Sequence, residues 1–217
     1  MILTTISPAN VQRQKIAIDS WLKLGYTVKS INSKSDIIKA KEFFDIEFVE
    51  TDKLGTEFGK DYVRLNGITD LIDTDCFVIN SDIELTHKLP LAVKGNSFTI
   101  YSRSDYADIH QRATKFPSGF DAFYITKEFA KQIPESKLVI GQCHWDYFLP
   151  IIAIRNNYHL FTPYKSGMYH KTHAIQYSLD KWRLTGKYFA QELGLSGNVL
   201  NDSNESYRLI KSKLNYF

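Results

Sequence analysis

The sequence has little of what defines a disulfide-bonded or strongly charged protein. Its 217 residues include two cysteines, Cys76 and Cys143, too few for a disulfide framework or a cysteine-rich zinc site. Both lie in apolar segments, so we expect two buried thiols in a reducing compartment. The formal net charge of +3 is too small to indicate nucleic-acid binding by itself.

Long apolar runs and linkers are also missing. The opening stretch MILTTISPAN has no basic leader, and its apolar run is too short for a signal-peptide core or a membrane span. We therefore expect a cytoplasmic chain with no membrane insertion. Because no Pro-, Gly- or Ser-rich linker and no repeat divides the sequence, one domain over residues 1–217 is predicted, long enough to bury a sizeable core.

Three motifs of well-known enzyme classes are absent as well. The sequence contains no G-x-x-x-x-G-K-[ST] loop, no G-x-G-x-x-G after a strand and no H-E-x-x-H. Each of these motifs places backbone amides or metal ligands where its chemistry requires them. Their absence argues against an ATPase, a dinucleotide oxidoreductase and a zinc metalloprotease.

What is present is an alternation of strands and helices. The apolar, β-branched segment ILTTIS predicts a first strand, which Pro8 breaks. A helix follows, with Asn10 expected to cap it and Gly25 to end it. Further strands are expected over residues 27–31, 46–49, 76–80, 97–101, 120–125 and 159–163, and further helices over residues 34–44, 62–72 and 145–155. This alternation predicts an α/β fold with a mostly parallel central sheet flanked by helices.

The strand ends are the expected binding region, because ligands of such sheets bind beyond the carboxyl ends of the strands. The apolar run Phe77-Val78-Ile79 leads directly into Asn80-Ser81-Asp82. One carboxylate at that edge, completed by phosphate oxygens of a ligand, suits Mg²⁺ or Mn²⁺. The alternative interpretation is that these polar residues merely form a turn after the strand.

Five short segments resemble the GT-A family of nucleotide-sugar glycosyltransferases. CFVINSDIEL resembles the strand and DxD element of that family, with Asn80 in place of the first acid. SGFDAFYITKEF and IGQCHWDYFLP resemble its acceptor side, and TTISPANVQRQ and YHKTH match its opening and closing segments. The resemblance implies a GT-A-like single domain, with a nucleotide-binding half (1–85), an acceptor and sugar half (86–175) and a helical tail (176–217).

The resemblance also implies a function. A GT-A enzyme with a metal-binding acid moves a hexosyl or pentosyl group from a nucleotide-diphosphate sugar to a hydroxyl acceptor, with Mn²⁺ or Mg²⁺ as cofactor. The acceptor stays open between a glycan, a protein and a modified DNA base. The stereochemistry also stays open, since retaining and inverting enzymes share these segments.

Matching positions give the expected site residues. Asp82 would bind the cation together with His173 or His170, of which His173 is preferred. Asp146 would be the general base of an inverting enzyme or would orient the donor sugar in a retaining one, and Asp121 would bind sugar hydroxyls. The residues expected to bind the nucleotide and its phosphates are Thr4, Thr5, Ser7, Arg13, Asn80 and Lys171.

Simpler roles compete with these assignments. Arg13 is equally an ordinary solvated arginine, and Asp146 is equally a favourable partner of a helix dipole. His144 is a weaker candidate for acceptor contact, and Trp145 is expected to pack beneath the site. At the level of the whole chain, a catalytically inactive nucleotide- or sugar-binding domain is the main alternative, and a phosphohydrolase lacks the clustered carboxylates of a two-metal site.

Overall fold

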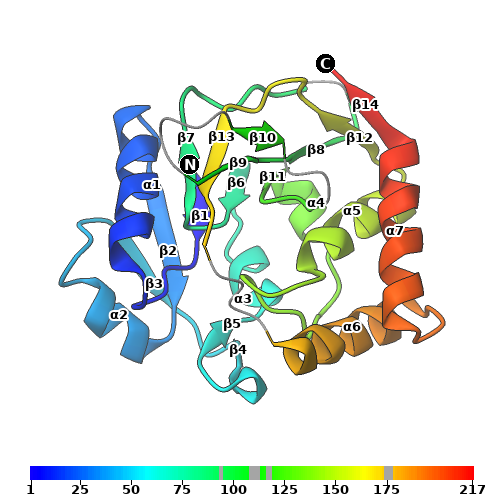
Figure 1. Ribbon diagram of the computed structural model, residues 1–217, viewed down its shortest axis with the longest axis horizontal. Coiled ribbons are helices and arrows are strands. Elements are labelled where there is room, and N and C mark those ends of the chain that lie inside the picture. The colour runs from blue at the N-terminus through cyan, green and yellow to red at the C-terminus, as the bar shows by residue number, and fades with distance from the viewer. Residues whose placement is uncertain (93–94, 108–112, 116–118, 174–177) are drawn as a thin grey trace.

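An eight-stranded, mostly parallel sheet forms the centre of the protein (Figure 1). The computed structural model describes residues 1–92, 95–107, 113–115, 119–173 and 178–217. In the strand order β14-β12-β8-β11-β6-β1-β2-β3, every neighbouring pair is parallel except the two pairs that β11 makes. The strands are β1 (Ile2–Thr4), β2 (Val28–Asn32), β3 (Glu47–Glu50), β6 (Cys76–Ile79), β8 (Ser97–Tyr101), β11 (Ala122–Ile125), β12 (His159–Thr162) and β14 (Leu214–Tyr216). The predicted fold class is thereby confirmed.

Helices flank the sheet and bury its two faces. Figure 1 shows α1 and α2 at one end of the molecule and α5, α6 and α7 at the other. Because successive residues of a strand point to opposite faces, Ile2 and Leu3 of β1 enter two different hydrophobic clusters. The helices are α1 (Val11–Lys23), α2 (Lys34–Ala40), the short η1 (Thr56–Phe58), α3 (Leu65–Thr69), α4 (Lys127–Ala130), α5 (Trp145–Arg155), α6 (Leu179–Leu193) and α7 (Val199–Lys213). No helix among the described residues combines the length and apolar character that a membrane crossing needs.

A smaller four-stranded sheet, ordered β10-β9-β13-β7, lies beside the central one. Its strands are β7 (Ile83–Leu85), β9 (Ser104–Tyr106), β10 (Thr114–Lys115) and β13 (Met168–Lys171), and a separate hairpin joins β4 (Leu54–Gly55) to β5 (Tyr62–Val63). Antiparallel pairing sets His170 of β13 opposite Ile83 of β7. The small sheet thus brings His170 next to the residue that precedes β7, which is Asp82.

The start of α1 differs from its prediction. Asn10 adopts a left-handed conformation (φ 59°) and its side chain makes no capping hydrogen bond. Gln14 stabilises this turn instead, because its Nε2 donates to the carbonyls of Ser7 and Ala9 at 2.7 Å and its Oε1 accepts from the amide of Ser7 at 2.8 Å. The predicted end is confirmed, since Gly25 follows the helix with φ 78°.

Two further predictions need correction. Residues 62–72 do not form one helix. Val63 belongs to β5 and pairs with Leu54 of β4, and α3 begins only at Leu65. His170 lies within β13 and not in a loop. The predicted boundary at residue 175 lies outside the described residues.

Candidate functional site

A cleft of about 720 Å³ lies at the carboxyl edge of the central strands. Its walls come from the segments that follow β1, β2, β6 and β8, from the segment before β11, and from the start of α5. Residues of β9, β13, α6 and α7 close its remaining sides. This is the edge where a parallel α/β sheet binds its ligands.

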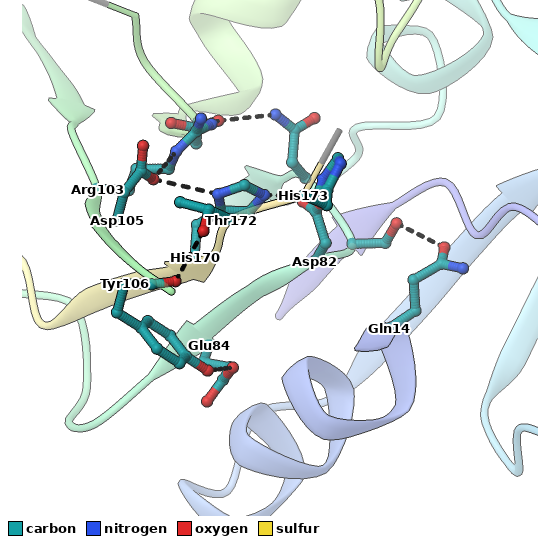
Figure 2. Close-up of polar contacts among 12 residues, drawn as sticks. Gln14, Asp82, Glu84, Arg103, Asp105, Tyr106, His170, Thr172 and His173 are labelled. Atoms are coloured by element: carbon teal, nitrogen blue, oxygen red, sulfur yellow. Dashed lines mark hydrogen bonds and ion pairs between the residues drawn. The ribbon is translucent and has the colours of Figure 1, made fainter. Parts of the chain in front are cut away.

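Asp82 and two histidines converge in this cleft (Figure 2). The Oδ2 of Asp82 lies 3.4 Å from the Nε2 of His170 and 3.5 Å from the Nε2 of His173. One ligand atom from each of the three residues lies within 4.8 Å of the others. The structure therefore brings both histidines to Asp82, where the sequence left a choice between them.

His170 is fixed from its other side by Asp105. The histidine is buried, and its Nδ1 lies 3.1 Å from the Oδ1 of Asp105. A carboxylate only accepts hydrogen bonds, so Nδ1 donates to Asp105, and Nε2 faces the Oδ2 of Asp82, which also only accepts. A metal ion bound beside Asp82 would take the place of the proton on Nε2, while Asp105 kept the ring oriented through Nδ1. Asp105 was missed in the sequence.

The carboxylate of Asp82 is held in its charged form. Burial, the largest single influence, raises the pKa of this group, but hydrogen bonds from His170 and His173 together with the charges of His170 and Arg103 lower the pKa below its usual range. An ionised carboxylate is the form that binds a hard cation, so Asp82 could serve as a ligand of a metal ion.

Arg103 links this cluster to a second pair of carboxyl groups. Its Nε donates to the Oδ1 of Asp105 at 2.7 Å, and its Nη1 donates to the Oδ1 of Asp121. The Nδ2 of Asn80 also donates to the Oδ1 of Asp121, at 3.1 Å. Asn80 lines the cleft, and its Nδ2 helps to position the carboxyl group of Asp121. Its contact with a nucleotide stays a prediction.

Asp121 and Asp146 form the second pair. Burial first, and then the charge of Asp121, raises the pKa of Asp146 to about 7. Burial also raises the pKa of Asp121, whose Oδ2 is buried and has no hydrogen-bond partner among the described residues. The Oδ2 of Asp146 accepts a long hydrogen bond from the amide of Phe120 (3.4 Å). A carboxyl group that titrates near neutrality suits proton transfer at physiological pH.

The expected nucleotide residues divide into two groups. Thr5, Ser7 and Arg13 line the cleft. Thr4 does not, because it is fully buried and its hydroxyl donates to the carbonyl of Ile79 at 2.7 Å. Lys171 is exposed and lies outside the cleft lining, because the alternation of β13 points it away from the buried His170.

Lys60 is a basic residue of the cleft that the sequence did not indicate. Its Nζ lies 3.5 Å from the Oγ of Ser7, and it lines the cleft. Burial lowers the pKa of this lysine because it disfavours the charged form. An anion bound beside Lys60 would stabilise that charged form. Its segment Gly59-Lys60-Asp61 follows a short 3₁₀ helix, and no sequence pattern distinguishes it from a surface turn.

The residues around the start of α5 have clear structural roles. Trp145 is 1% exposed and packs edge-to-face on Phe123 at 5.3 Å, as predicted. His144 is buried, with Nδ1 3.0 Å from the hydroxyl of Thr185 and Nε2 3.0 Å from the hydroxyl of Ser203. Burial lowers the pKa of His144 to about 4, so this histidine stays neutral. Its two ring nitrogens bond to α6 and α7, and it thereby links these helices to the start of α5.

Cys143 differs from its prediction. It is only half-buried and lines the cleft, in contrast to the expected burial.

Neither a protein-family model nor a curated protein matches this chain. The geometry of the cleft is therefore the main indication of what kind of chemistry this protein performs. In that geometry, three residues that could hold a metal ion share one cleft with a carboxyl group whose pKa is about 7.

Proposed function

We propose that this chain is a cytoplasmic, metal-dependent glycosyltransferase that moves a sugar from a nucleotide-diphosphate sugar to a hydroxyl acceptor. The observation that carries the proposal is the convergence of Asp82, His170 and His173 in the cleft at the carboxyl edge of the sheet. Arg13 and Lys60 line the same cleft and suit the two phosphates of a donor.

The ligand atoms favour one of the two predicted cations. Asp82 offers one carboxylate oxygen, whereas His170 and His173 offer imidazole nitrogens. Mg²⁺ strongly prefers oxygen ligands and near-ideal octahedral geometry, so the mixed set fits Mn²⁺ better. When bound, the cation would neutralise the diphosphate of the donor. Three protein ligands also leave positions for the phosphate oxygens.

The nucleotide would lie across the ends of β1 and α1. Thr5 and Ser7 follow β1 and offer hydroxyl groups to the base and ribose. Arg13 lies in the first turn of α1, where the side-chain charge and the helix N-terminus both favour phosphate. Lys60 beside Ser7 adds a second positive charge, which stabilises the diphosphate as it leaves.

Asp146 would handle the proton of the acceptor. In an inverting reaction its carboxylate removes the proton of the acceptor hydroxyl as that oxygen bonds to the anomeric carbon, and the bond from this carbon to the diphosphate breaks. A pKa of about 7 suits a base that is re-used at each turnover. In a retaining reaction Asp146 would orient the donor sugar instead, and in both cases Asp121 would accept from sugar hydroxyls.

A catalytically inactive binding domain is the second candidate, and Asn80 favours it. This residue stands where the family has an acid, and its amide nitrogen donates a hydrogen bond to Asp121, so the segment Asn80-Ser81-Asp82 supplies one charged ligand. A two-metal phosphohydrolase fits less well, because such sites gather several carboxylates and the ligand group in the described residues contains one.

Calorimetric titration of UDP and GDP, with and without Mn²⁺, tests the proposal on the wild type and on Asp82→Ala. We expect Mn²⁺ to tighten binding of at least one nucleotide, and that nucleotide to tighten Mn²⁺ by the same factor. Asp82→Ala should lose this coupling, because it removes the anionic ligand and the partner of both histidines. Asp70→Ala is the matched control, since Asp70 is an exposed carboxylate that does not line this cleft.

Turnover separates the two candidates. Metal-dependent hydrolysis or transfer from a panel of UDP- and GDP-sugars supports the transferase, whereas metal-coupled binding without any turnover supports the inactive binding domain. Equal nucleotide affinities in all four measurements, with and without Mn²⁺ in both proteins, would show that Asp82 is only a turn residue.

A further inference from the structure

The C-terminal helices α6 and α7 form part of the lining of the cleft. The sequence presents residues 176–217 as a tail, yet α6 and α7 contribute side chains to the cleft next to those from the start of α5. We call these residues the helical wall; they are Gln142, Tyr147, Trp182, Leu200, Ser203 and Asn204. The helical wall lies on the same side of the cleft as Asp146, so it faces the place where an acceptor would react.

The helical wall is held rigidly in place. The ring of His144 bonds the hydroxyls of Thr185 in α6 and Ser203 in α7, each at 3.0 Å. The helices cross closely at Gly186, where an added Cβ would lie only 2.1 Å from a methyl carbon of Val199. A site whose supporting residues are fixed by packing and hydrogen bonds can select a ligand by shape.

Two buried acceptor atoms in the cleft lack partners. The Oδ2 of Asp121 and the Oε1 of Gln142 have no hydrogen-bond partner among the described residues, although both side chains are over nine-tenths buried and both line the cleft. Buried polar atoms are nearly always paired, so these two require donors from a ligand or water. A ligand rich in hydroxyl groups supplies such donors at several positions.

Trp182 provides an apolar surface in the same cleft. Trp182 is half-buried, whereas the other two tryptophans, Trp21 and Trp145, are at most 1% exposed. Its ring rests against His144, with ring centroids 5.6 Å apart. The negative face of an aromatic ring attracts the C–H groups of a sugar ring, while hydroxyls at the edge of that sugar remain available for hydrogen bonds.

The charges of the cleft argue against a nucleic-acid acceptor. Among the described lining residues, the basic side chains Arg13 and Lys60 lie on the nucleotide side, and Arg103 is paired with Asp105 and Asp121. The helical wall itself contributes none. Because nucleic-acid binding depends on neutralising phosphates, an uncharged, hydroxyl-rich acceptor suits the wall better than DNA.

We propose that the helical wall binds a carbohydrate acceptor, with a sugar ring stacked on Trp182 and hydroxyls donated to Asp121 and Gln142. The word acceptor rests on the proposed function, whereas carbohydrate binding at this wall does not. The proposal selects a glycan from the three acceptor classes that the sequence leaves open.

Tryptophan fluorescence of the full chain tests the proposal directly. Acrylamide quenches tryptophans that the solvent reaches, and half-buried Trp182 is the most accessible of the three. We expect protection from quenching by at least one member of a set of soluble oligosaccharides built from glucose, galactose, mannose, rhamnose and N-acetylglucosamine, measured with and without UDP and Mn²⁺. A peptide rich in serine and threonine and a DNA oligonucleotide carrying 5-hydroxymethylcytosine are the competing probes.

Variants assign the signal to the wall. With the protecting sugar, Trp182→Ala should weaken binding by roughly tenfold or more, as measured by calorimetry, whereas Trp182→Phe retains part of the affinity because it keeps an aromatic face. Tyr164→Ala is the matched control, since that aromatic residue is 72% exposed and lies outside the cleft lining. Equal losses in Trp182→Ala and Tyr164→Ala would overturn the proposal.

The measurements with and without UDP and Mn²⁺ distinguish the carbohydrate site from the proposed transferase activity. Sugar protection without any metal-dependent nucleotide binding supports the carbohydrate site and contradicts the transferase. Nucleotide binding and turnover with no protection by any sugar, or with protection by the peptide or the oligonucleotide alone, overturns the carbohydrate site and leaves the transferase standing.

Discussion

Two carboxyl environments share one cleft and differ in charge. Asp82 contacts His170 and His173, and its pKa is lowered below the usual range. Asp146 is half-buried beside Asp121, and burial and that neighbouring charge raise its pKa to about 7. Arg103 joins the two regions, because it pairs with Asp105 behind His170 and with Asp121 beside Asp146.

The difference shows how one residue type serves two kinds of chemistry. Basic partners keep Asp82 ionised, as a metal ligand requires. Burial and a like charge keep Asp146 close to its titration point, as a proton acceptor requires. A pair of acids with separated pKa values in one cleft is therefore a reason to assign them different roles, and the predictions below test this separation.

The largest expected effect comes from removing the support of the Asp146 region. Trp145 is 1% exposed and packs on Phe123, so Trp145→Ala should lower the free energy of unfolding by about 3–5 kcal/mol. Urea denaturation measures the loss. Trp182→Ala, the same substitution at a half-buried tryptophan, should cost clearly less, and equal losses would show that Trp145 does not form the base of the site.

A smaller effect is expected from the Asp82 region. Asp105→Asn replaces the carboxylate that accepts from the Nδ1 of His170, so the imidazole loses its fixed orientation and part of its basicity. Substitutions of such supporting partners lower metal affinity by about 10- to 100-fold. Calorimetric titration of Mn²⁺ in the presence of saturating nucleotide measures the change.

Glu84→Gln is the control for Asp105→Asn. Glu84 is also a carboxylate of the small sheet and accepts from the hydroxyl of Tyr106, away from the two histidines (Figure 2). We expect its Mn²⁺ affinity to match that of the wild type. An Asp105→Asn protein with unchanged Mn²⁺ affinity would show that His170 needs no partner at Nδ1, and it would remove the reason for treating the Asp82 region as a built metal site.

Local pattern was sufficient for much of the fold. The bounds of α5, Trp145 and Arg155, match the prediction, because a continuous apolar segment follows His144 and Asn156 ends it. The parallel sheet follows from alternating strands and helices, and Asp82 at its edge follows from a buried strand that ends in polar residues. The capping of α1 did not follow, because Gln14 folds back on Ser7 and replaces Asn10.

The partners in the site were beyond local pattern. Asp105 and His170 are 65 positions apart in the chain, and only the pairing of β9 with β13 brings them together. One signal was available, since Arg103 and Asp105 follow the apolar strand β8 in the same way that Asp82 follows β6. Because β8 and β6 run in the same direction, their carboxyl ends meet at one edge, and this comparison would have selected both residues.

The smallest expected effect concerns the pH dependence of stability and tests the Asp146 region alone. The ordinary pKa of an aspartate is 3.8, and that of Asp146 in the folded protein is about 7. Between these two values the native state keeps a proton that the unfolded state releases. Stability therefore decreases as the pH rises through this window and levels off above pH 7. Asp146→Asn removes this dependence, because an amide does not titrate.

We therefore expect Asp146→Asn to be more stable than the wild type near pH 8 and similar to it near pH 4. Three pKa units correspond to about 4 kcal/mol, and partial exposure of the side chain reduces the expected difference to about 1–2 kcal/mol. Urea denaturation of both proteins across this range measures it, and the difference curve removes most of the contribution of other shifted acids, such as Glu192, which both proteins contain. Activity should fall in the same variant, since the amide cannot accept a proton. A flat difference curve would mean that Asp146 titrates like an exposed aspartate, and the contrast with Asp82 would then lose its physical basis.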